Sequence, residues 1–157
     1  MNIIRARAQH ISEMNEVILS AKGHWGYSQE MMDVWLPDLI VDAVVLANRH
    51  FWVLEAEGRI VGVFSISVDA EQRSELEDFW VSPQLMGRGA GRIMFGFIQN
   101  WLQDQQLPEL VIVSDPHAKG FYERMGAEEI GFQPSLPAGR KLPVMRYVLE
   151  PRPLRTV

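Results

Sequence analysis

Three glycines at every second position, Gly87, Gly89 and Gly91, are the residues whose type and spacing most directly suggest chemistry. Glycine lets the backbone approach a ligand closely and take dihedral angles that a Cβ would exclude. An amphipathic helical pattern begins directly after them, so the free N–H groups and the positive dipole end of its first turn point into the loop. Arg88 and Arg92 add positive charge. The loop is therefore suited to bind an anion, most often a phosphate. The alternative is a tight strand-to-helix turn without a ligand.

Two widespread phosphate-binding patterns do not fit this loop. The dinucleotide fingerprint requires a third glycine three residues after the second, where this chain has Arg92. The P-loop requires a lysine after its last glycine. Gly91 and Gly96 have the P-loop spacing, but Phe97 follows them. A nucleotide-binding protein of either class is therefore disfavoured.

The segment from Val81 to Arg92 resembles the pyrophosphate-binding loop of the GCN5-related N-acetyltransferases, which move an acetyl group from acetyl-CoA to an amine. The family pattern is Gln/Arg-x-x-Gly-x-Gly/Ala after a strand that ends Val-x-Pro, and Val81-Ser82-Pro83 and the three glycines match it. Met86 stands where the family has Arg or Gln. Because backbone amides do most of the holding in such a loop, we expect this departure to weaken CoA affinity at worst.

A second segment, Asp115 to Ala127, resembles the other motif of the family, Asn-x-x-Ala followed by an apolar residue, Tyr-Glu and a closing Gly-Phe or Gly-Ala. Asp115 replaces the usual Asn and can cap the helix that follows. The resemblance implies that acetyl-CoA is the cosubstrate. The implied contacts to it are Phe79, Trp80, Val81, Met86, Gly87, Arg88, Gly89, Ala90, Gly91, Arg92, Asp115, Ala118, Phe121 and Tyr122.

Acetyl transfer also requires proton carriers. The resemblance implies that Tyr122 donates a proton to the leaving thiolate, whereas taken alone it is typical of the edge of a core. A backbone N–H near Val81 can stabilise the oxyanion. An alkyl ammonium has a pKa near 10, so a base is needed. We expect Glu77 to be this base, with Glu75 next, and strand alternation places Asp78 on the opposite face. The alternative is that these carboxylates are solvated strand residues.

The acceptor pocket is expected from the first two helices and the last loop of the chain. Trp25, Tyr27 and Trp35 are candidates for its walls, because aromatic faces suit a cation. Arg140 is a candidate to hold a substrate carboxylate, since the guanidinium fork fits one. The alternative for the aromatic residues is core packing.

The elements that position these residues follow from periodicity. A strand over Glu75–Val81 leads into the glycine loop, and a helix runs from about Gly91 to Gln106. Residues 38–49 are ambiguous between helix and strand. The last two strands are expected at about Glu128–Phe132 and Val144–Leu149, with a proline- and glycine-rich loop between them. This order predicts an α+β fold. The sheet is mixed and mostly antiparallel, is flanked by helices, and by the resemblance has a splayed parallel strand pair.

Length and composition limit the remaining possibilities. The 157 residues suit a single domain over residues 1–157, with a core of about residues 3–149. A net charge of −5 gives no support to a nucleic-acid partner and slightly favours a cationic acceptor. The absence of cysteine excludes thiolate metal sites, the four histidines show no metal-ligand spacing, and no metal is expected.

No apolar run is long enough to span a bilayer, and the first residues lack the apolar region of a signal peptide, so we expect a cytoplasmic protein without a membrane partner. The acceptor is expected to be a small-molecule or peptide amine. Homodimers are common in the family, but the sequence locates no interface. The rival interpretation is a catalytically silent acyl-CoA-binding sensor or interaction module, which the off-pattern residues Met86 and Asp115 favour.

Overall fold

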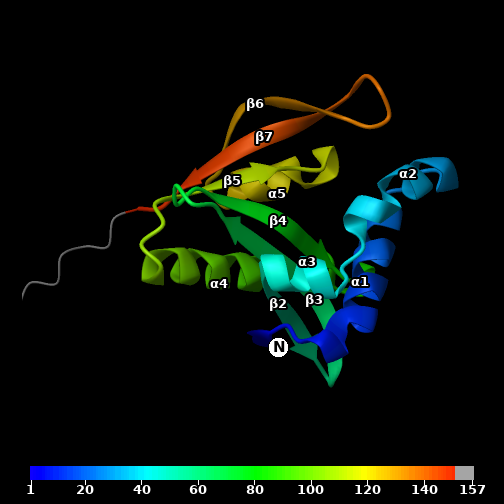
Figure 1. Ribbon diagram of the computed structural model, residues 1–157, viewed down its shortest axis with the longest axis horizontal. Helices are drawn as coiled ribbons and strands as arrows, with labels where there is room; N and C mark the ends of the chain where they lie inside the picture. The colour runs from blue at the N-terminus through cyan, green and yellow to red at the C-terminus, as the bar shows by residue number, and fades with distance from the viewer. Residues whose placement is uncertain (151–157) are drawn as a thin grey trace, which may run out of the picture.

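A computed structural model describes residues 1–150 of the chain. Its centre is a seven-stranded sheet in the order β1-β2-β3-β4-β5-β7-β6, in which only the β4–β5 pair is parallel. The strands are β1 (Asn2–Arg5), β2 (His50–Ala56), β3 (Arg59–Val68), β4 (Ser74–Val81), β5 (Glu109–Val113), β6 (Glu128–Ser135) and β7 (Arg140–Val148). The predicted α+β fold with a mixed, mostly antiparallel sheet is confirmed (Figure 1).

Helices cover both faces of the sheet. They are α1 (Ile11–Gly23), α2 (Gln29–Leu39), α3 (Ala43–Asn48), α4 (Ala90–Asp104) and α5 (Lys119–Arg124), with short 3-10 turns at Ala8–His10, Pro83–Leu85 and Pro116–Ala118. Met14, Val17 and Ile18 of α1 pack on one face, against Val53 and Val63. A larger core lies on the other face, under α4 and α5. No helix within residues 1–150 has both the length and the hydrophobicity to span a membrane.

Local sequence signals explain several element boundaries. Ser28 caps α2 by accepting a hydrogen bond from the amide of Met31 at 3.2 Å. Asp42 caps α3 through the amide of Val45 at 2.8 Å, so the ambiguous region becomes a short helix followed by β2. The last two strands extend further toward each other than expected, so the proline- and glycine-rich loop between them is limited to residues 136–139. Strands β6 and β7 continue through Pro134 and Pro143. Pro134 is tolerated because β6 is an edge strand, and the Pro143 carbonyl accepts a hydrogen bond from the amide of Ser114 at 2.9 Å.

Strands β4 and β5 pair over a very short distance. Only Glu75 with Val111 and Leu76 with Ile112 are in register. At the same point β4 contains a bulge, because Leu76 and Asp78 have partners on β3 and Glu77 has none. Beyond Leu76, β4 continues to Val81 without β5 as a neighbour. The predicted splayed parallel pair is therefore present, and the sheet is open there.

Candidate functional site

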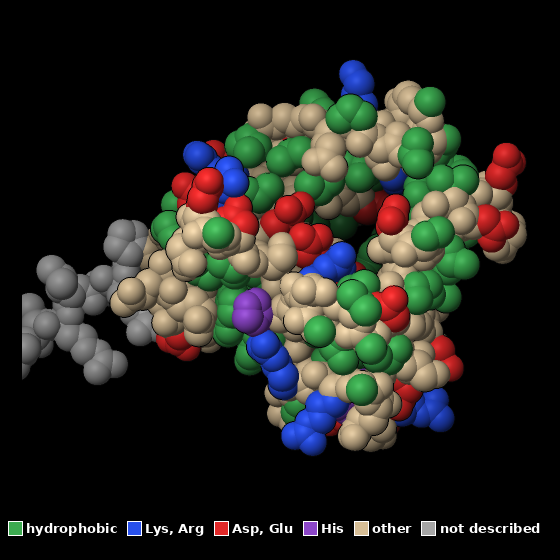
Figure 2. All heavy atoms as spheres, in the orientation of Figure 1, with side chains coloured by type: hydrophobic (Ala, Val, Ile, Leu, Met, Phe, Trp, Pro, Cys, Tyr) green, Lys and Arg blue, Asp and Glu red, His purple; other side chains and the backbone are tan. Residues whose placement is uncertain are grey.

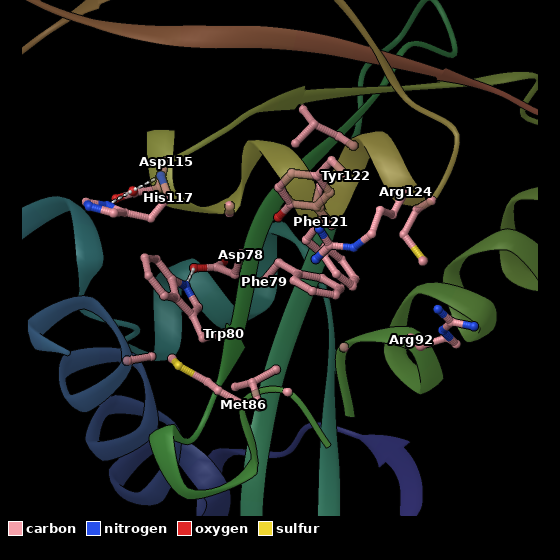
Figure 3. A pocket seen from close by; sticks show the side chains of 18 of the residues that line it. Asp78, Phe79, Trp80, Met86, Arg92, Asp115, His117, Phe121, Tyr122 and Arg124 are labelled. Atoms are coloured by element: carbon pink, nitrogen blue, oxygen red, sulfur yellow. Dashed lines mark hydrogen bonds and ion pairs between the residues drawn. The ribbon is translucent and has the colours of Figure 1, made fainter. Parts of the chain in front are cut away.

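A cavity of about 490 Å³ lies where β4 and β5 separate (Figure 3). Its walls come from β4, from the loop before α4, from the end of β5 and from α5, with two residues from the end of α1 and the loop after it. The lining residues are Ala21, Trp25, Leu76, Glu77, Asp78, Phe79, Trp80, Val81, Leu85, Met86, Gly87, Gly89, Gly91, Arg92, Ile112, Val113, Asp115, His117, Ala118, Phe121, Tyr122, Arg124 and Met125.

Nearly all of the cofactor contacts expected from the sequence line this one cavity. The two exceptions are Arg88 and Ala90. Arg88 is exposed, and Ala90 is fully buried as the first residue of α4, beneath the loop. A side-chain contact to a ligand in the cavity is therefore not expected from either.

Glycine is required at each of the three loop positions, and the physical reason differs between them. Gly87 and Gly89 have φ angles of +74° and +87°, the left-handed region that other residues avoid. Gly89 is also the N-cap of α4. Gly91 has an ordinary helical φ, but a Cβ there would lie 3.1 Å from the Phe121 ring. The glycines thus shape the loop and bring α4 close to α5 at the cavity wall.

Tyr122 lies deep in the same cavity with only 5% of its surface exposed. Its ring is packed among Phe79, Phe95 and Phe121, with ring centres 5.4 to 6.4 Å away. Burial, with a further contribution from the Asp115 charge, raises the pKa of Tyr122 well above its usual range. Tyr122 is therefore a protonated phenol over the whole physiological range, and Figure 3 shows its hydroxyl directed into the cavity.

The three acidic residues of β4 have three different environments. Glu77 is exposed, lines the cavity and accepts a hydrogen bond from Ser67 at 2.7 Å. Asp78 also lines the cavity but is buried and accepts from Ser65 and Arg49. Glu75 does not line the cavity, and its pKa is raised by burial and then by the Glu77 charge.

The predicted alternation of these acidic residues is wrong. Glu77 bonds to Ser67 and Asp78 bonds to Ser65, and these serines stand two residues apart on β3, so they share one face. The bulge at Glu77 is the cause, because it rotates Asp78 onto the face where Glu77 lies. Two carboxylates therefore reach the same side of the cavity.

Asp115 is the centre of a hydrogen-bond network at the end of β5. Its carboxylate accepts from Lys22 Nζ at 2.6 Å, from Tyr27 Oη at 3.1 Å and from the backbone N–H of His117 at 2.9 Å. Only 8% of the Lys22 side chain and 14% of the Asp115 side chain are exposed, so this ion pair is largely shielded from water. Burial lowers the pKa of Lys22 although the Asp115 carboxylate opposes this shift.

The residues expected to bind the acceptor converge on this network. Lys22 Nζ and the Arg140 guanidinium lie 4.2 and 4.5 Å from the centre of the Trp35 ring. Trp35 donates to the carbonyl of Leu136 at 2.7 Å, and Arg140 donates to Tyr27 Oη at 3.3 Å. Of the four predicted residues only Trp25 lines the cavity. Tyr27, Trp35 and Arg140 join α2 and the β6–β7 hairpin to Asp115, and thus support the cavity from behind.

Sequence reasoning missed Lys22, Arg49, His117 and Arg124 as parts of the site. Lys22 lies one turn after Ile18 on the buried stripe of α1, and a lysine in an apolar stripe is a signal that a buried partner exists. His117 and Arg124 lie inside the recognised second motif. Arg49 carries no local signal, because only the sheet brings it to Asp78.

We expect the Asp115 network to make the protein acid-sensitive. Burial alone would raise the pKa of Asp115, but the Lys22 ammonium and the His117 amide outweigh it and hold the pKa at about 2. A carboxyl with a depressed pKa stabilises the fold above its ordinary pKa of about 4, and this stability is lost as the pH falls toward 2. Urea unfolding between pH 6 and pH 2.5 should show a smaller loss of stability in Asp115→Asn than in the wild type. The prediction would be contradicted if the free energy of unfolding fell equally with pH in Asp115→Asn and in the wild type.

Comparisons with known proteins agree with this geometry. Residues 11–127 match the model of the acetyltransferase (GNAT) family. The PaiA N-acetyltransferase from Thermoplasma acidophilum, solved in complex with coenzyme A, has a TM-score of 0.73 at 14% identity, over 94% of this chain and 99% of that one. The ribosomal-protein-S18-alanine N-acetyltransferase from Escherichia coli has a TM-score of 0.70 at 14% identity, over 99% and 98%.

A GNAT-family acetyltransferase from Staphylococcus aureus Mu50 has a TM-score of 0.72 at 18% identity, over 95% of this chain and 99% of that one. No curated protein matches the chain. The structural similarities show the fold, and the family model covers about three quarters of the sequence, including both motifs. The chain therefore belongs to the GNAT family of acetyltransferases.

Proposed function

We propose that this protein is an N-acetyltransferase that moves the acetyl group of acetyl-CoA to a primary amine by direct attack on the thioester. The observation that carries the proposal is that the glycine loop and the buried hydroxyl of Tyr122 open into one cavity between two separated strands. A ligand whose phosphates are bound by the glycine loop can therefore bring its other end to the Tyr122 hydroxyl, which can donate a proton. The acceptor is a small-molecule or peptide amine.

The residues present fit acetyl-CoA as the cosubstrate. Backbone amides at the start of α4 and the side chains of Arg92 and Arg124 supply positive potential for phosphates. Phe79 and Phe121 give the middle of the cavity apolar walls, with their ring centres 5.4 Å apart. Met86 also lines the cavity, so the Arg or Gln side chain usual at this position is replaced by an apolar contact. Bound acetyl-CoA supplies the acetyl group and the thiolate leaving group.

Each remaining requirement of the reaction has a candidate in this chain. The amide of Ser82 donates to β3, so the preceding amide, of Val81, points to the opposite edge of β4 and into the opening. It is the candidate oxyanion donor. Tyr122 is the candidate proton donor to sulfur. Glu77 lines the cavity and is exposed, whereas Asp78 is buried. We propose that Glu77 attracts the acceptor's ammonium, and it is also a candidate for the base that deprotonates this ammonium. Glu75 lies outside the cavity and is not retained.

A thiol-release assay with a panel of amines tests the proposal, with CoA binding measured in parallel by calorimetry. The panel should contain a polyamine, an aromatic amine, an amino acid and a peptide with a free N-terminus. Thiol release with one class supports the enzyme and names its acceptor. CoA binding without turnover across the panel would favour the silent CoA-binding module instead. Cytoplasmic location and dimerisation remain predictions.

We expect Gly89→Ala to weaken CoA binding by more than tenfold. The left-handed φ of Gly89 costs an alanine about 1 to 2 kcal/mol, and relaxing it would turn the loop amides away from the phosphates. Gly96→Ala is the matched control, because Gly96 lies inside α4 with no atom within 4 Å of an added Cβ. Calorimetric titration with CoA measures both variants. Unchanged affinity in Gly89→Ala would exclude the loop as the phosphate site.

A further inference from the structure

His117 lies at the end of the cavity away from the predicted phosphate site. Figure 3 shows it on the side opposite Arg92 and Arg124, beside Asp115 and above Trp80. It lines the cavity together with Glu77 and Trp25. Its side chain is 41% exposed, and the surface is hollowed between α5 and the α1–α2 segment (Figure 2), so His117 is accessible to a molecule that enters from that side. An acceptor that approaches from this side meets His117 before it meets Tyr122.

The imidazole of His117 is fixed in orientation from two directions. Its face is stacked on the Trp25 ring at 4.6 Å, with an angle of 5° between the planes. Its Nδ1 lies 2.9 Å from Asp115 Oδ1 and 3.1 Å from Tyr27 Oη. Nδ1 therefore carries the proton of the neutral ring and donates it to the carboxylate. No residue within 1–150 forms a hydrogen bond with Nε2, so its lone pair is free for a proton.

The charge of Asp115 is what makes this orientation useful. Lys22 and the backbone keep the carboxylate ionised, and an ionised carboxylate both fixes the tautomer and stabilises an imidazolium. The family pattern has an uncharged Asn at this position, which would offer no such stabilisation. The other charged and titratable groups around the pair are Tyr27 before α2, Arg140 on β7, and Glu77 and Asp78 on β4 across the cavity.

We propose that His117, oriented by Asp115, accepts the proton that the acceptor ammonium must lose before it attacks the thioester. This inference rests on the proposed function. In the step, an N–H bond of the ammonium breaks, an Nε2–H bond forms, and the positive charge moves from the amine to the imidazolium. The exposed ring edge then returns the proton to water. A base works best when its conjugate acid has a pKa near the working pH, which suits an imidazole better than an ordinary carboxylate.

The kinetic test compares His117→Gln with two controls, using the amine that the wild type acetylates fastest. His24→Gln is the matched control, because His24 contacts the same Trp25 ring at 4.9 Å but does not line the cavity. We expect His117→Gln to lower kcat/KM about 100-fold or more, to leave CoA affinity within twofold, and to remove the acid limb of the pH profile. His24→Gln should match the wild type. Glu77→Gln should keep the acid limb and raise KM.

A measurement without turnover supports the same assignment. Nitrogen-15 NMR of the free protein should show the neutral His117 ring protonated at Nδ1, the nitrogen that faces Asp115 Oδ1. The proposal is overturned if His117→Gln and His24→Gln behave alike, if Glu77→Gln removes the acid limb, or if the imidazole is protonated at Nε2. Failure of the proposed function is distinct from all of these, since it appears as a wild type that acetylates no amine.

Discussion

Tyr122→Phe lowers kcat by about 100- to 1000-fold while CoA affinity changes by less than twofold. This is the expected loss of a positioned proton donor, an effect that typically contributes between 10² and 10⁴ in rate. The variant keeps the ring contacts with Phe79, Phe95 and Phe121, so the cavity keeps its shape. Only the hydroxyl that faces the cavity is lost. Stopped-flow measurement of thiol release at saturating acetyl-CoA and acceptor gives kcat, and calorimetry gives the affinity.

The matched control for this experiment is Tyr147→Phe. Tyr147 also packs against Phe95, with ring centres 5.2 Å apart, and its hydroxyl accepts a hydrogen bond from Gln99 at 2.9 Å instead of lining the cavity. Loss of that hydroxyl should leave kcat within twofold of the wild type. Equal losses in the two variants would mean that the Tyr122 hydroxyl acts on the fold and not on the leaving thiolate.

Lys22→Ala lowers the free energy of unfolding by about 3 to 5 kcal/mol, the usual cost of leaving one member of a buried ion pair without its partner. Asp115 would remain as a poorly solvated negative charge, held by the hydrogen bonds from Tyr27 and His117 and by the more distant Arg140 guanidinium at 3.7 Å. The variant also loses the ammonium above the Trp35 ring. For a chain of this size, each kcal/mol lowers Tm by about 2 to 4 °C. Urea unfolding followed by circular dichroism measures the change.

A double variant distinguishes lost charge pairing from lost packing. Lys22→Met together with Asp115→Asn removes both charges and keeps most of both side-chain volumes, so it should be more stable than either single variant. Arg73→Ala is a control for a surface pair, because Arg73 and Asp69 form an ion pair at 2.8 Å with 73% and 44% of their side chains exposed, and its removal should hardly move Tm. If the double variant were no more stable than Lys22→Met, the ion pair would not be the source of the effect.

Much of the donor side of the site could be predicted, because its residues are close together in the sequence. The turn, the glycine dihedrals and the start of α4 all follow from the segment between Val81 and Arg92, where local rules are sufficient. Tyr122 and Asp115 lie in a second short segment, whose residues are also close together in the sequence. The two exceptions, Arg88 and Ala90, arise because a helix start directs neighbouring side chains to different sides.

The acceptor side could be predicted only in part, because it is assembled from distant segments. The sequence indicates Tyr27 and Trp35 as walls of the acceptor pocket and Arg140 as a carboxylate ligand, but Asp115, which contacts Tyr27 and Arg140, is 88 residues from Tyr27 in the sequence. The contacts with Asp115 hold these side chains behind the cavity wall, so they support the cavity and do not line it. The face of Asp78 was predicted wrongly for a related reason. A bulge is visible only in the register of two paired strands, so no local pattern around Glu77 reveals it.

The short β4–β5 pairing has a consequence for solubility. An open strand edge is normally a template on which other chains add strands and aggregate. Here the open edge of β4 beyond Leu76 faces the cavity, and α5 and the glycine loop close the cavity on two sides. An extended ligand in the cavity can use these free backbone groups, and the walls around them separate the edge from the outer surface. The protein therefore keeps unpaired strand backbone available inside a fold without offering it to neighbouring molecules.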